Sequence, residues 1–165
     1  MKIIINQTIK MMLVEINQAN LHDIIRFIHI LISATLLVFA IWLIIRSSIG
    51  IIKHKEYTRL DKFLAYAFLI SLYLQLLFGF LLFTKFGPMS GYDYLGGDSG
   101  SRLASKRLWP IEHIVLMFFA LLIATLGLIL SSKSTVAKEK HKKVLIYYVF
   151  AILIIAQSLC AIYLF

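Results

Sequence analysis

The chain has 165 residues, of which 61% are hydrophobic and only 15% are charged, with a formal net charge of +9. This composition is far more apolar than that of an average soluble domain, so a soluble globular protein is excluded. The excess of positive charge does not require a nucleic-acid partner, because basic loops beside anionic lipid headgroups account for it. We therefore expect membrane lipids, and no nucleic acid, among the partners.

Four long windows of the sequence contain no Asp, Glu, Lys or Arg. In chain order they are Phe27–Ile45, Phe63–Thr84, His113–Ser132 and Val144–Phe165. Each window has about 19 to 22 residues, which at about 1.5 Å per residue matches a hydrocarbon core of about 30 Å. Backbone polar groups inside lipid must be satisfied within the segment, so these windows are helices. The sequence predicts an all-α fold, an integral membrane four-helix transmembrane bundle over residues 23–165, with helices at about 24–46, 62–84, 110–132 and 144–165.

The first 22 residues have an amphipathic pattern. Apolar residues recur there at helical spacing, at Ile5, Ile9, Met12 and Ile16. The first apolar run is too short for the hydrophobic region of a signal peptide. We expect residues 1–22 to form a separate N-terminal interfacial segment ahead of the bundle.

Lysine and arginine are densest in two of the connecting segments. These residues are Arg46, Lys53, Lys55, Arg59 and Lys62 between the first two helices, and Lys133, Lys138, Lys140, Lys142 and Lys143 between the last two. The N-terminal segment and the middle loop over residues 85–108 are longer and less basic. By the positive-inside rule we expect a bacterial inner-membrane protein with both dense loops in the cytoplasm and both termini on the periplasmic side.

The histidines divide into two groups. His54 and His141 lie in the basic loops, as "KHKE" and "KHKK", and we expect both to be solvated. His29 lies within the first apolar window and His113 in the first turn of the third, and these two helices run in the same direction. At about 1.5 Å per residue, both imidazoles fall near the outer face at similar depths. The cytoplasmic half of the bundle is expected to hold few polar groups, with no histidine and no acid inside the membrane.

Ionisable side chains inside a membrane are costly and usually face the bundle interior or a cavity. Bis-histidine ligation of a haem b would explain two histidines at one depth, because it needs axial imidazoles from two helices. Such a site also needs a small residue beside the porphyrin and cations for its propionates. The candidate cofactor-binding residues are His29 and His113 as iron ligands, with Gly79, Gln75 and Arg26 around them, and Arg102, Lys106 and Arg107 as further outer cations.

Other interpretations of the same residues stay open. Pro110 and Glu112 suit a helix start, so His113 can belong to an ordinary interfacial helix N-terminus. His29 can hydrogen-bond across helices without any ligand. Another metal, a quinone, or packing with no cofactor are the remaining alternatives. Packing is favoured by a stripe of small residues on the third helix that lets a neighbour approach closely, at Ala120, Ala124 and Gly127.

Four stretches of the chain carry a family resemblance: "IRFIHILISATLLVF", "LQLLFGFLLF", "EHIVLMFFALLIATLG" and "KHKKVLIYYVFAILI". Over residues 25–160 the chain resembles a family of small four-helix membrane proteins of Bacteroidetes that are commonly labelled cytochrome-b-like. The motifs are an early histidine in the first helix, Leu-Gln-Leu-Leu-x-Gly in the second, and Glu-His-x-x-x-Met at the start of the third. The resemblance implies a shared core at His29, Gln75, Gly79, Glu112, His113 and Met117.

Two function classes follow from these observations. The first is a small b-type-cytochrome-like redox protein that holds at most one haem near the outer face, between the first and third helices. Its redox partner would be a quinone or a periplasmic electron carrier. The alternative is a non-catalytic accessory subunit that packs against other subunits of a larger, respiratory membrane complex. The sequence identifies no catalytic residue and leaves open whether the chain is an enzyme.

Overall fold

The computed structural model describes the backbone of residues 2–86 and 104–164. Within these ranges the chain forms four helices: α1 (Lys2–Ile52), α2 (Arg59–Phe86), α3 (Ala104–Ser132) and α4 (Ala137–Leu164). All four are long and apolar enough to cross a membrane. The predicted all-α four-helix membrane fold is therefore confirmed.

All four helices begin earlier than the sequence windows predict, α2 by only about one turn and the other three by more. α1 runs without a break from Lys2, so the N-terminal segment is continuous with the first membrane helix. α3 begins at Ala104, and Pro110 lies inside it instead of at its start. α4 begins at Ala137 and includes most of the basic run that precedes the apolar window. The helices begin before the apolar windows because a charged side chain interrupts an apolar window but not a helix. Lysine in particular is a good helix former.

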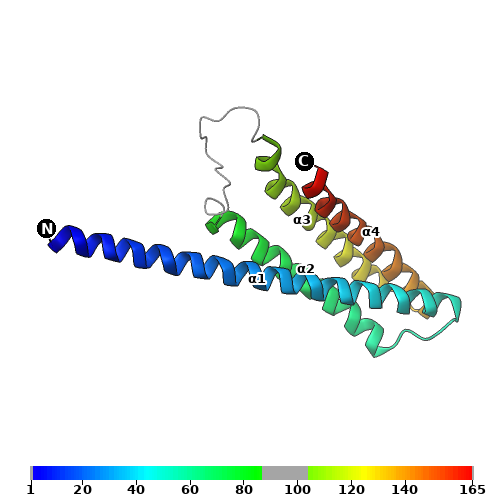
Figure 1. Ribbon diagram of the computed structural model, residues 1–165. Helices are drawn as coiled ribbons and strands as arrows, with labels where there is room; N and C mark the ends of the chain where they lie inside the picture. The colour runs from blue at the N-terminus through cyan, green and yellow to red at the C-terminus, as the bar shows by residue number, and fades with distance from the viewer. Residues whose placement is uncertain (1, 87–103, 165) are drawn as a thin grey trace.

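The fold consists of two antiparallel hairpins, α1–α2 and α3–α4, which pack against each other (Figure 1). α1 also contacts α4, and α2 contacts α3, so that α1 and α3 lie diagonally across the bundle. Residues 53–58 and 133–136 connect the helices at one end, which we call the short-loop end. The opposite end, where α1 enters the bundle and α4 finishes, is called the terminal end. The N-terminal part of α1 extends away from the bundle (Figure 1).

The core is a seam of residues spaced alternately by three and four along each helix. Its buried members are Leu36, Ala40, Leu43 and Ser47 on α1; Asp61, Leu64, Phe68, Leu72 and Gln75 on α2; Met117, Ala120, Ala124 and Ser131 on α3; and His141, Val144, Tyr148, Ala151, Ile155 and Ser158 on α4. This spacing is typical of left-handed bundles with small crossing angles. At its centre, the Tyr148 hydroxyl donates to the Ala65 carbonyl at 3.0 Å.

The predicted close approach to α3 is present at Gly127. A Cβ added there would clash with the Cβ of Tyr147 on α4. Ala120 and Ala124 on the same stripe are fully buried. Small residues on α3 therefore allow α4 to pack closely against it, as the sequence predicted.

The short-loop end is more polar than predicted, and its acid is buried. Asp61 in the first turn of α2 is 2% exposed, and Arg46 of α1 donates to both of its carboxylate oxygens, at 2.7 and 3.2 Å. The same carboxylate accepts from the backbone N–H and the hydroxyl of Thr58, at 2.8 and 2.6 Å. Thr58 and Asp61 thus form a capping box, and Arg46 ties this helix start to α1.

His141 is also buried, so its predicted solvation is wrong. Only 1% of it is exposed, and its Nε2 donates to the Glu56 carbonyl at 3.5 Å. Because α4 begins at Ala137, His141 lies one turn inside the helix and shares the buried face with Val144. His54, in contrast, is exposed as predicted.

Candidate functional site

At the terminal end, His29 joins a hydrogen-bonded network between α1 and α2. The Gln75 side-chain amide donates to Nε2 of His29 at 2.9 Å and also to the hydroxyl of Ser33. That hydroxyl in turn donates to the backbone carbonyl of His29 at 3.0 Å. Gln75 is buried, and His29 and Ser33 are half-buried. The polar side chains that the sequence placed at one depth therefore meet between the two helices.

The network leaves two buried atoms without a hydrogen-bond partner among the described residues, Nδ1 of His29 and Oε1 of Gln75. Because Nε2 of His29 accepts from the amide, the neutral ring carries its proton on Nδ1. A buried donor or acceptor that lacks a partner costs about 1 to 3 kcal/mol, so such a pair of atoms needs an explanation. One explanation is a group that binds between the helices.

Gly79 lies directly against the imidazole of His29. A Cβ added at Gly79 would be 3.2 Å from Cε1 and 3.8 Å from Nδ1 of that ring. This contact is one turn from Gln75 along α2, at i and i+4. The glycine therefore permits the close approach of the imidazole, and a larger side chain at this position would displace it.

His113 belongs to the other hairpin. Its Nδ1 forms a 2.7 Å hydrogen bond with the hydroxyl of Ser158, a buried residue of α4. This bond holds the ring so that Nε2 lies on its opposite side. His113 and His29 are within range of electrostatic interaction with each other. The two histidines thus lie near each other on diagonally opposite helices, and each is hydrogen-bonded within its own hairpin.

The remaining predicted residues are not part of this arrangement. Arg26 is exposed, so the structure does not bring it to the histidines. Arg102 and the side chains of Lys106 and Arg107 lie outside the described residues. Met117 is buried one turn below His113, whereas Glu112 is exposed. Two serines that the sequence analysis did not single out contact these networks: Ser158 bonds to the imidazole of His113, and Ser33 shares the Gln75 amide with His29.

The chemistry of the donor set favours a ligand that takes two imidazoles. Among the described residues, no group of three His, Cys, Asp or Glu side chains lies close enough to hold a metal ion. A haem iron needs only two axial protein ligands, because the porphyrin supplies the other four. The unpartnered Nδ1 of His29 and the glycine beside that ring are compatible with such a group. The hydrogen bond between Gln75 and Nε2 of His29 would have to open, or the ring would have to turn, if Nε2 were the ligand.

Comparisons with protein-family models, with curated proteins and with solved structures find no match to this chain. The resemblance to cytochrome-b-like proteins of Bacteroidetes therefore stays a prediction from the quoted stretches. The fold and the two histidine networks carry the functional argument.

Proposed function

We propose that this chain is a small membrane redox protein that holds one haem b at the terminal end, with His29 and His113 as axial ligands. The observation that supports this most is that the half-buried imidazoles of His29 and His113, on the diagonally opposite helices α1 and α3, lie near enough to interact electrostatically. A single prosthetic group could contact both only by lying across the bundle. Iron-porphyrin would supply one-electron transfer.

The residues around the two rings support the proposal in different ways. Ser158 accepts or donates at Nδ1 of His113, and such second hydrogen bonds orient metal-binding histidines. Gly79 lets the His29 imidazole lie close against α2. Gln75 and Ser33 hold His29 in the absence of a ligand. The redox partner we propose is a quinone or an electron carrier on the side that the terminal end faces.

The orientation of the bundle is part of the same proposal. Exposed lysines gather at the short-loop end, among them Lys53, Lys55, Lys138 and Lys142. By the positive-inside rule this end would face the cytoplasm of a bacterial inner membrane, and the haem would lie on the periplasmic side. A cysteine-labelling experiment with a membrane-impermeant reagent at positions 53 and 138 tests this assignment.

A second candidate function, an accessory subunit of a larger membrane complex, is favoured by α1. This helix would be about 76 Å long at about 1.5 Å per residue, more than twice a hydrocarbon core of about 30 Å. Beyond the bundle it exposes large apolar side chains, including Met11, Leu13 and Ile16. Another subunit would cover them, and the histidine networks would then serve only helix packing.

The absorbance spectrum of the purified protein separates the two functions. The full chain is purified from haem-replete cells, and the reduced-minus-oxidised difference is recorded. We expect a b-type band with one haem per chain, which is lost in both His29→Ala and His113→Ala. His54→Ala is the matched control, because His54 is an exposed histidine at the opposite end, and this variant should keep the band.

Gly79→Leu provides an independent variant, because it keeps both histidines in the sequence but displaces the His29 ring from its position against α2. It should reduce haem content while the helical circular dichroism stays unchanged. A wild-type protein that is folded and helical but has no band would contradict the haem proposal. In that case, loss of thermal stability in His29→Ala would support a purely structural network.

A further inference from the structure

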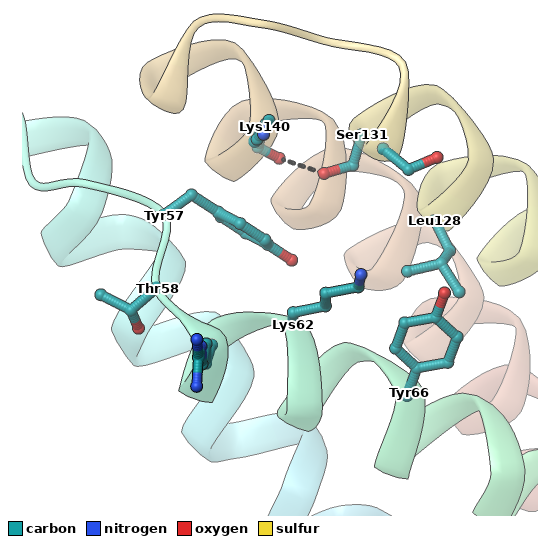
Figure 2. Close-up of a pocket in the computed structure, with 9 residues that line it drawn as sticks. Tyr57, Thr58, Lys62, Tyr66, Leu128, Ser131 and Lys140 are labelled. Atoms are coloured by element: carbon teal, nitrogen blue, oxygen red, sulfur yellow. Dashed lines mark hydrogen bonds between the residues drawn. The ribbon is translucent and has the colours of Figure 1, made fainter.

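A cavity of about 220 Å³ opens at the short-loop end, between the start of α2, the end of α3 and the start of α4 (Figure 2). Three cationic residues line it, Arg59, Lys62 and Lys140, and no carboxylate does so among the described residues. None of the three has an ion-pair partner in the described part of the chain, whereas Arg46 nearby is paired with Asp61. Their positive charges are therefore concentrated around one hollow without neutralisation.

Hydroxyl groups complete the polar part of the lining. Figure 2 shows the Lys62 ammonium extending into the space between the rings of Tyr57 and Tyr66, with Ser131 across from it. The Lys62 nitrogen is 5.9 Å from the centroid of the Tyr66 ring, and the Lys140 nitrogen is 6.0 Å from that of Tyr57. Burial raises the pKa of the Tyr57 phenol to about 12, so at neutral pH this hydroxyl keeps its proton. The Ser131 hydroxyl donates to the Lys140 backbone carbonyl at 3.2 Å, so the cations are the main phosphate-binding groups around this small space.

The lining changes from polar to apolar with depth. Ser131 lies in the last turn of α3 and Lys62 in the first turn of α2, where the membrane spans end. One turn further into the membrane, the cavity is lined by Leu128 and by the Tyr66 ring. Tyr66 is itself 42% exposed, and the next turn of α2 exposes Ile70. The apolar end of the cavity therefore adjoins the surface that faces acyl chains. A free anion would not need such an apolar end.

We propose that this cavity binds the phosphate of an anionic phospholipid, with Arg59, Lys62 and Lys140 around the phosphate and Leu128 and Tyr66 beside its first acyl carbons. Basic pockets between transmembrane helices near a membrane surface bind such headgroups. The site is at the opposite end of the bundle from the two histidines, so it does not depend on the haem proposal.

Native mass spectrometry of the full chain tests the proposal. The detergent-solubilised protein is incubated with equimolar phosphatidylglycerol and phosphatidylcholine, and the retained lipid is identified. We expect one phosphatidylglycerol to be retained preferentially. Each cation at a membrane surface contributes about fivefold, so Lys62→Gln should weaken retention about fivefold and the triple change of Arg59, Lys62 and Lys140 to Gln more than tenfold.

A matched triple variant, with Lys53, Lys138 and Lys142 changed to Gln, removes the same charge from exposed positions outside the cavity. It should retain phosphatidylglycerol within about twofold of the unchanged protein, since charges on the open surface are screened. Equal loss in both triple variants would overturn the proposal, because the attraction would then be diffuse. Lys62→Arg keeps the positive charge and should still retain phosphatidylglycerol. This variant therefore shows whether the loss in Lys62→Gln comes from the missing charge or from misfolding.

Two soluble probes distinguish a lipid from a free anion. Inorganic phosphate and glycerol-1-phosphate are titrated into the protein, and displacement of phosphatidylglycerol is followed. A lipid site is supported if these probes displace phosphatidylglycerol only at concentrations far above that of the lipid. Tight binding of inorganic phosphate without any preference for phosphatidylglycerol would overturn the assignment to a lipid, and so would retention of phosphatidylcholine to the same extent.

Discussion

Gly50 of α1 lies directly against the ring of His141 on α4. A Cβ added at Gly50 would be 2.5 Å from Nε2 of that imidazole and 2.6 Å from its neighbouring ring carbons. The ring also contacts Tyr57 edge-on, with 4.9 Å between the ring centroids. The two hairpins therefore meet at the short-loop end through a histidine that fits only because position 50 has no side chain.

Gly50→Ala should destabilise the bundle, although alanine is the better helix former by about 1 kcal/mol. Forcing a methyl group into a filled site costs about 1 to 3 kcal/mol, so overpacking should outweigh the helix propensity. The measurement is the thermal unfolding midpoint in detergent, followed by far-UV circular dichroism. Adding His141→Ala should restore part of the loss by making room. A Gly50→Ala protein at least as stable as the unchanged one would contradict this packing.

Asp61→Ala should destabilise more than Arg46→Ala. Removing the acid breaks the ion pair and also the capping bonds from Thr58, whereas removing the guanidinium leaves the cap in place. Breaking a buried pair costs about 3 to 5 kcal/mol, but the Arg46 side chain is 33% exposed, so we expect about 1 to 3 kcal/mol for Asp61→Ala. A double-mutant cycle in denaturant measures the coupling. Additive effects of the two changes would show that the pair contributes nothing.

His54→Gly should stabilise the protein by up to about 1 kcal/mol. His54 has a φ of 50°, in the left-handed region, and Lys55 donates its N–H to the Gly50 carbonyl at 3.0 Å. These features form a Schellman motif at the end of α1, whose left-handed position is usually glycine. Lys53→Gly, one residue earlier, is the control and should not stabilise. The unfolding midpoint of each variant decides the comparison.

Hydropathy was enough to predict the number of membrane helices, because lipid imposes a minimum apolar length on each one. The helix starts were missed where charged residues continue the helix beyond the apolar window, as Lys138 and Lys142 do in α4. The burial of His141 was missed for the same reason. Its spacing of three and seven residues from Val144 and Tyr148 was a sequence signal of a shared face.

At the candidate site, the sequence predicted the depth of the two histidines in the membrane but not their hydrogen-bond partners. The sequence placed Gln75 and Gly79 among the candidate residues around His29, and the structure brings them into contact with it. The pairing of His113 with Ser158 joins residues 45 positions apart and depends on how α3 and α4 pack. Arg26 was predicted to belong to the site because of its positive charge. It is exposed, because the way α1 packs in the bundle decides which of its faces is buried.

The two hairpins are each fastened at both ends, and this has a mechanical consequence. α1 and α2 are joined by Gln75 with His29 and by Arg46 with Asp61, whereas Tyr148 and His141 of α4 connect the two hairpins, the latter at the short-loop end. Each hairpin should therefore move as a stiff unit, and the softest motion should be a change in the spacing of the two hairpins at the terminal end, away from these contacts. A molecule bound by one histidine from each hairpin would restrain that motion.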